Sequence, residues 1–244
     1  MSSDKMKVPD DRDKYDVYYS DFDRGYIGEQ YNNENQSTKA LLTFMQESIS
    51  EDASVSILDA GCGDGAMLAS AGRRFRNAKL AGFDIARAMI EYAREQHPKE
   101  VRIGKGDILD ITSFSKEKFD VIYTVHTICL FPNFETPVRS LMNSARKHVF
   151  INSLFSPQNI DMYANVDEPG MPAVPWNIFS VKRFAEFVML EGAKDVVFRE
   201  FEMPFELEKP EEGMGSYTRQ LNDGRFLTFS GPLFLPWYLV RIDL

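Results

Sequence analysis

Apolar and polar positions follow two different spacings along this chain. Short apolar runs rich in branched side chains alternate with stretches in which apolar residues recur every three or four positions. The first spacing predicts buried strands, and the second predicts amphipathic helices. We expect strands at residues 55–58, 79–83, 101–104, 119–124 and 148–153, and helices at residues 66–75, 87–96 and 136–146. This alternation predicts βαβ units and a parallel sheet with helices on both faces.

The flanking segments add further elements. Helices are expected at residues 35–49 and 181–191, the second with Ser180 as its N-cap and Gly192 just past its end. Strands are expected at residues 193–201 and 237–242. Between them, the turn Asn222-Asp223-Gly224 is flanked by alternating residues and therefore predicts an inserted hairpin.

Composition narrows the class of protein. A length of 244 residues allows one large α/β domain, and a net charge of −9 disfavours nucleic acid as a partner. No apolar run is long enough to span a bilayer, and the first ten residues do not read as a signal peptide. Cys62 and Cys129 both fall in core-like segments, which favours free thiols and a cytoplasmic location.

A glycine-rich loop is the strongest chemical signal. Asp59 ends the first strand, and Gly61, Gly63 and Gly65 lead into the next helix. Glycines allow a ligand to approach the backbone, and the N–H groups at the start of a helix point towards it. The same glycines, with Ala66, also satisfy the dinucleotide fingerprint Gly-x-Gly-x-x-Gly/Ala, and a purely structural turn is a third interpretation.

The order Asp-x-Gly-x-Gly-x-Gly resembles the first motif of the class I S-adenosylmethionine-dependent methyltransferases. The resemblance implies that Asp84, about twenty residues further on, binds both ribose hydroxyls. A dinucleotide fold would use Asp84 in the same way, and capping of the next helix is the structural alternative. Asp107 and Ile108 resemble the residues that bind the adenine ring in that family. The alternative is that Asp107 is only a turn residue at the surface. The expected cofactor surface also includes Ile85 and Val125.

Residues 119–133 are similar to the fourth-strand motif of that family, in which many members carry Leu-His-His-apolar-Pro-Asp. This chain has its histidine two positions earlier, at His126, which puts its role in doubt. His126 is nevertheless the best candidate for a general base, with a hydrogen-bonded loop histidine as the alternative. His97 is expected to be a solvated helix end, and His148 to be structural. No metal site is expected.

The resemblance implies a Rossmann-like, doubly wound, seven-stranded α/β sheet. We expect residues 1–50 to form a helical cover, with Tyr18 and Tyr26 on the cofactor. Residues 51–244 should form the S-adenosylmethionine-binding domain, with the hairpin inserted near residues 216–231. The segment 155–179 is long and proline-rich, and its Met162, Tyr163, Met171 and Trp176 are candidates for an apolar acceptor pocket, with residues 231–237 as a further wall.

The predicted function is transfer of a methyl group from S-adenosylmethionine to an O, N or C atom of a small-molecule acceptor. Two alternatives remain: a non-catalytic module that binds the same cofactor, and a dinucleotide-binding oxidoreductase. No tyrosine is followed four positions later by lysine, which argues against a short-chain dehydrogenase. The acceptor and the oligomeric state cannot be inferred from these motifs.

Overall fold

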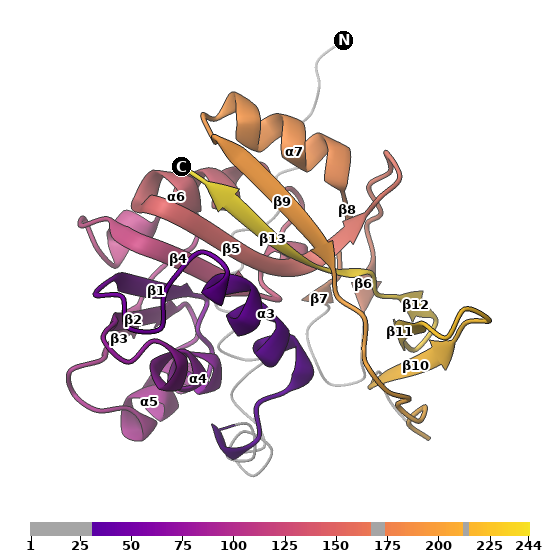
Figure 1. Ribbon diagram of the computed structural model, residues 1–244, viewed down its shortest axis with the longest axis horizontal. Helices are drawn as coiled ribbons and strands as arrows, with labels where there is room; N and C mark the ends of the chain where they lie inside the picture. The colour runs from indigo at the N-terminus through magenta and orange to yellow at the C-terminus, as the bar shows by residue number, and fades with distance from the viewer. Residues whose placement is uncertain (1–30, 167–173, 212–214) are drawn as a thin grey trace.

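The computed structural model describes residues 31–166, 174–211 and 215–244, and its main feature is one mixed sheet (Figure 1). Five parallel strands are followed at one edge by two strands that alternate in direction, in the order β3-β2-β1-β4-β5-β13-β9. The bounds are β1 Ser56–Ala60, β2 Lys79–Asp84, β3 Arg102–Lys105, β4 Phe119–Val125, β5 Ala145–Ser156, β9 Asp195–Glu200 and β13 Trp237–Asp243. A short strand, β8 (Phe179–Ser180), also pairs with the end of β5. The expected doubly wound sheet is confirmed, and β8 brings the seven expected strands to eight within the described residues.

Helices cover both faces of the sheet (Figure 1). On one face lie α3 (Gln36–Gln46), α4 (Ala66–Arg74) and α5 (Arg87–Gln96), whose apolar residues pack on β1, β2 and β5. On the other face, α6 (Glu135–Ser144) and α7 (Val181–Leu190) pack on β4, β5 and β13. Each helix buries an apolar stripe, as its residue spacing predicts.

Local signals in the sequence mark several of the helix ends, although α3 ends at Gln46, three residues before the expected end. The Asn35 carboxamide accepts a hydrogen bond from the Thr38 N–H at the start of α3. The Ser180 hydroxyl accepts one from the Arg183 N–H at the start of α7. Gly192, with φ of 98°, follows the end of α7 in the left-handed conformation. These caps satisfy backbone groups that a helix leaves unpaired at its ends.

The hairpin predicted around Asn222-Asp223-Gly224 is present. Strands β10 (Ser216–Gln220) and β11 (Phe226–Ser230) pair antiparallel, and β12 (Leu233–Phe234) adds a third short strand. This small sheet projects from the main one (Figure 1). A two-stranded ribbon, β6 (Asn165–Val166) and β7 (Val174–Pro175), lies on the β8 side of the molecule.

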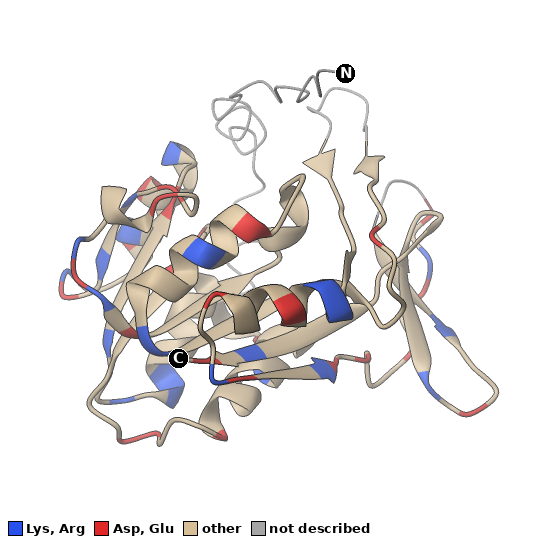
Figure 2. Ribbon diagram, turned by 90° about the horizontal axis from the view of Figure 1, so that it is seen from above, with Lys and Arg blue, Asp and Glu red and all other residues tan. Residues whose placement is uncertain are grey.

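Figure 2 shows Lys, Arg, Asp and Glu positions spread over the helices, the connecting loops and the strand ends. No helix within the described residues is long and apolar enough to cross a membrane. The expected cytoplasmic location stays a prediction.

Candidate active site

The loops that follow the parallel strands meet at one edge of the sheet. The chain passes from β1 to β2 on one side, and β4 lies on the other side of β1, so the strand order reverses between β1 and β4. Ligands of such sheets bind where the carboxyl ends of the strands meet this reversal. The sequence-predicted residues Asp59, Asp84, Asp107 and His126 stand at or just after the ends of β1, β2, β3 and β4. The fold therefore brings them to one edge.

The three loop glycines all adopt left-handed backbone conformations, with φ of 81°, 51° and 86° at Gly61, Gly63 and Gly65. A Cβ at Gly61 would come within 2.8 Å of the Thr127 Oγ1, so this glycine allows the loop to pack against the segment after β4. A Cβ at Gly63 would have no atom of the described residues within 4 Å. Within the described part of the chain, Gly63 therefore presents bare backbone, as a ligand-binding glycine requires.

The Asp84 carboxylate joins the glycine loop to the start of α5. Its Oδ2 accepts a hydrogen bond of 2.8 Å from the Gly63 N–H, and its Oδ1 accepts one of 2.9 Å from the Ala86 N–H. A carboxylate oxygen has more than one acceptor position, so these bonds leave capacity for a ligand hydroxyl. Helix-end stabilisation and ligand binding are thus compatible at Asp84.

Asp59 lies beneath the loop, and its side chain is 2% exposed. Burial raises the pKa of this carboxyl well above its usual value, the neighbouring Tyr123 hydroxyl lowers it, and the charges of Asp84 and Asp64 raise it further. Asp59 therefore offers little surface to a ligand. Its direct contact with a cofactor stays a prediction.

Tyr31 and His97 hold the glycine loop from the side. The Tyr31 hydroxyl donates a hydrogen bond to the Asp64 carbonyl, and the His97 Nε2–H donates one of 3.0 Å to the Gly65 carbonyl. The two rings are 5.8 Å apart. Burial is the main cause both of the raised pKa of Tyr31 and of the lowered pKa of His97. His97 does follow the end of α5, as expected, but it is half-buried, so the expectation that it is solvated is wrong.

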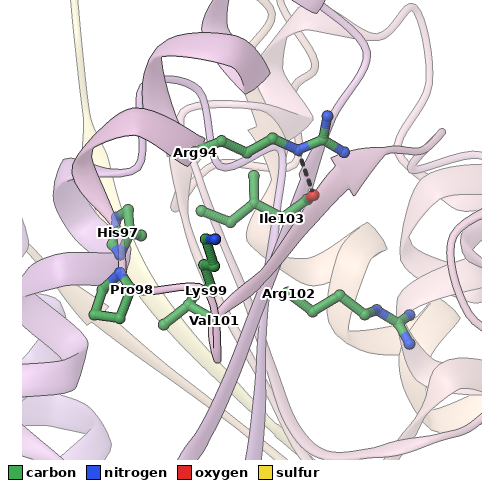
Figure 3. A pocket seen from close by; sticks show the side chains of 7 residues that line it. All are labelled: Arg94, His97, Pro98, Lys99, Val101, Arg102 and Ile103. Atoms are coloured by element: carbon green, nitrogen blue, oxygen red, sulfur yellow. Dashed lines mark hydrogen bonds between the residues drawn. The ribbon is translucent and has the colours of Figure 1, made fainter.

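Sequence reasoning missed this pair because no motif marks it. The contacts join residues more than thirty positions apart in the chain. On the side away from the loop, His97 borders a pocket of about 340 Å³ between α5 and β3 (Figure 3). Two arginines line this pocket, and both make structural hydrogen bonds. Arg94 donates to the Ile103 carbonyl, and Arg102 donates to the Phe114 carbonyl.

Asp107 and Ile108 follow β3 next to Asp84, since the Gly106 N–H donates a 3.0 Å hydrogen bond to the Asp84 carbonyl. The Asp107 Oδ1 accepts from the Leu109 N–H at 2.9 Å, so this carboxylate also stabilises its own turn. Ile108 is largely buried in the main core. Ile85 and Val125 are half-buried. The positions suit a cofactor surface, and the individual contacts stay predictions.

His126 occupies an unusual backbone conformation after β4. Its φ of 56° is the only positive value at a non-glycine residue in the part of the chain that the structure describes. The His126 N–H donates to the Asn152 carbonyl at 2.9 Å, and its ring packs on Trp237 with centroids 4.2 Å apart. The local fold therefore sets the direction of this side chain, and such strain is common at functional sites.

Although part of the His126 ring is exposed, the surrounding protein replaces enough water to lower its pKa to about 4, and the Asn152 side chain offsets this only in part. The imidazole is therefore neutral at physiological pH and is a weaker base than a histidine with an ordinary pKa. Its catalytic role stays a prediction. The predicted cofactor contacts Tyr18 and Tyr26, and the pocket candidate Met171, lie outside the described residues.

A family model described as "Methyltransferase domain" matches residues 57–148, from the middle of β1 into β5. Among curated proteins, the trans-aconitate 2-methyltransferase of Deinococcus radiodurans is 29% identical over 96 residues, covering 39% of this chain and 36% of that protein. The malonyl-[acyl-carrier protein] O-methyltransferase of Bacillus cereus is 30% identical over 111 residues, covering 45% of this chain and 40% of that protein. The chain thus matches only about two fifths of the length of these relatives.

The fold extends the similarity over nearly the whole chain. The crystal structure of magnesium protoporphyrin IX methyltransferase from Synechocystis, with bound S-adenosylmethionine, superposes with a TM-score of 0.54 at 12% sequence identity. The match covers 95% of this chain and 89% of that one. At this identity, the likeness establishes the architecture of the sheet and its helices.

Proposed function

We propose that this chain, which carries a class I methyltransferase domain, is an S-adenosylmethionine-dependent methyltransferase that acts on a small molecule. The observation that carries the proposal is the open backbone at Gly63, bordered by the carboxylate of Asp84. The loop, Asp84 and Asp107 stand at the edge of the sheet where ligands bind in this architecture.

The residues at this edge fit the cofactor. The backbone at Gly63 carries no side chain, so the amino-acid part of S-adenosylmethionine can lie close to it. The carboxylate of Asp84, which accepts a hydrogen bond from the Gly63 N–H, can also accept hydrogen bonds from ribose hydroxyls. Asp107 lies two residues beyond the end of the neighbouring strand β3, where its carboxylate can accept from an adenine amino group. The Asp84 carboxylate beside the loop also favours a ligand with a positive charge.

When bound, S-adenosylmethionine supplies an activated methyl group: the acceptor's lone pair forms the new bond to carbon, while the carbon–sulfur pair remains on sulfur. The protein must then align the acceptor with that bond and exclude water. His126 stands beyond β4, next to the glycine loop through Thr127. Its neutral imidazole can orient an acceptor hydroxyl or amine by a hydrogen bond and accept its proton.

A small-molecule acceptor is supported by two observations. The curated relatives are named for methylation of trans-aconitate and of a malonyl group on acyl-carrier protein. The net charge of −9 opposes binding to a polyanion such as nucleic acid.

Calorimetry with S-adenosylmethionine, its demethylated product S-adenosylhomocysteine and NAD tests the cofactor assignment. We expect micromolar binding of the first two and none of NAD. Micromolar binding of NAD without binding of the methyl donor would overturn the proposal. Transfer of a labelled methyl group to a panel of small acceptors then distinguishes an enzyme from a binding module.

A further inference from the structure

Four segments that meet beside His126 carry almost no charge. They are residues 126–134, 149–166, 174–180 and 226–240, and Asp161 is the only Asp, Glu, Lys or Arg among them, although such residues make up 27% of the chain. Asp161 is itself neutralised by an ion pair with Arg183, and it accepts a hydrogen bond from the Ser180 N–H. The described surroundings of His126 therefore offer no free charge from these segments.

Hydrogen bonds show that the four segments form one unit. The Asn177 N–H donates to the Cys129 carbonyl at 2.8 Å, and the Trp176 N–H donates to the Ala164 carbonyl at 2.8 Å. Trp237 is paired with Leu154 of β5. Residues far apart in the sequence are thereby joined at the carboxyl ends of β4 and β5, on the side of the site away from Asp84.

Three rings form a continuous aromatic wall in this unit, made of His126, Trp237 and Trp176. Trp237 contacts both of the others, with ring centroids 4.2 Å from His126 and 6.1 Å from Trp176. Trp237 is 8% exposed, whereas Trp176 is half-buried and His126 is exposed. The accessible surface of the wall therefore belongs mainly to His126 and Trp176, and the buried Trp237 contacts both.

The lack of charge does not come from burial alone. Ile160 is 56% exposed, Met162 43% and Tyr163 60%, and Met162 pairs through its backbone with Ile178, two residues after Trp176. Large apolar side chains that are exposed together near a predicted site often mark a ligand-binding surface. A carboxylate placed there would lose hydration without gaining an opposite charge, since the His126 imidazole is neutral.

We infer that the acceptor is an uncharged ring compound, stacked on the wall of His126 and Trp176, whose nucleophile is a hydroxyl or a neutral amine. This inference rests on the proposed function. It separates this chain from the two curated relatives, whose names give acidic acceptors. A flat ring gains stacking energy on tryptophan, and a neutral nucleophile needs no countercharge from the site.

The two tryptophans of the chain are both in this wall, so they report on it directly. The test uses protein labelled with ¹⁵N-tryptophan and saturated with S-adenosylhomocysteine. It compares 2-naphthol with 2-naphthoate, which share a ring system and differ in charge at neutral pH. We expect 2-naphthol to shift both indole N–H resonances and to bind about tenfold more tightly than 2-naphthoate.

Trp176→Leu should weaken 2-naphthol about tenfold and leave the affinity for S-adenosylhomocysteine unchanged. Phe205→Leu, at another exposed ring outside the four segments, is the matched control and should change neither. Equal or tighter binding of 2-naphthoate, binding of 2-naphthol without indole shifts, or no binding of 2-naphthol would each overturn the inference. Methylation of trans-aconitate would do the same while leaving the proposed function intact. Failure of S-adenosylhomocysteine to bind would instead remove the proposed function.

Discussion

The two halves of the chain build their parts of the site in different ways. In the part of the chain that matches the methyltransferase domain, the predicted cofactor residues stand at or just after strand ends, and much of the surface is backbone. The surface around Trp176 and Trp237, which lie mostly outside that match, is instead assembled from aromatic side chains on separate segments that carry hardly any charge. A cofactor shared by many enzymes is bound by a local motif, whereas an acceptor is selected by side chains that only the complete fold brings together.

The two regions also differ in charge: carboxylates surround the glycine loop, whereas the segments around the tryptophans are almost uncharged. Around the glycine loop, the charges of Asp84 and Asp64 raise the pKa of Asp59, and the charge of Asp84 raises the pKa of Asp64. The described segments around Trp176 and Trp237 contain a single charged residue, already paired. Substitutions in the first region should therefore change cofactor affinity, while substitutions in the second should change acceptor affinity.

The largest effect is expected at Gly63, with Gly224 as its matched control. Both have positive φ, 51° and 90°, and a Cβ at either would meet no atom of the residues that the structure describes within 4 Å. Gly63→Leu should weaken S-adenosylhomocysteine about hundredfold, because the side chain occupies the ligand's place. Gly224→Leu, at the hairpin tip, should leave that affinity unchanged, although each variant loses about 1–2 kcal/mol of stability from backbone strain. Calorimetry and thermal unfolding measure the two effects, and equal affinities in both variants would contradict the role of Gly63.

Asp84→Asn should have the next largest effect, a loss of about thirtyfold in affinity for S-adenosylhomocysteine. The substitution removes the charge and one acceptor oxygen, and hydrogen bonds to charged groups contribute about 1.5–3 kcal/mol. Asp223→Asn is the control, since Asp223 accepts a backbone hydrogen bond within the distant hairpin. A wild-type affinity in Asp84→Asn, measured by calorimetry, would remove Asp84 from the cofactor site.

A smaller effect is expected from Tyr31→Phe, which deletes the hydrogen bond to the Asp64 carbonyl and retains the ring. Affinity for S-adenosylhomocysteine should fall about fivefold, because one hydrogen bond of about 1 kcal/mol no longer holds the loop. Tyr92→Phe, on the ring that packs 6.3 Å from Tyr31, is the control. If both variants bind equally well, Tyr31 contributes packing alone.

His97 can be tested alongside Tyr31 with two substitutions that differ in hydrogen bonding. His97→Gln retains a donor for the Gly65 carbonyl, whereas His97→Leu does not. Cofactor affinity should be close to wild type in the first and reduced about fivefold in the second. Equal losses in both would show that the ring itself, rather than its N–H, supports the loop.

The smallest effect concerns pH. The pKa of His126 is about 4 in the folded protein and 6.5 as its ordinary value, so between these values the unfolded chain binds a proton that the folded chain does not. Stability should therefore fall as the pH falls from 6.5 towards 4. His126→Asn should flatten this dependence, and asparagine tolerates the left-handed backbone at this position. Thermal unfolding at several pH values between 4 and 6.5 measures this slope. Part of the slope should remain in the variant, because the pKa of His97 is also lowered. Unchanged slopes in the variant would show that His126 does not titrate in this window.

Much of the fold was predictable because its signals are local. The bounds of α5 match the expected 87–96, and the caps Asn35, Ser180 and Gly192 act as their residue types imply. Strand β5 is longer than the expected 148–153, since it begins directly after α6 and continues to pair with β8. That extension depends on partner strands, which no window of sequence contains.

The sequence by itself determined the order of strands and helices and the positions of Gly63, Asp84, Asp107 and His126 at strand ends, because hydrophobic spacing and turn chemistry act over a few residues. Only the tertiary structure decided which residues from distant parts of the chain lie next to these site residues. It placed His97 on the glycine loop, surrounded His126 with enough protein to lower its pKa, and joined Trp176 to Trp237. Burial and contact between remote segments depend on how elements pack, and packing is a property of the whole chain.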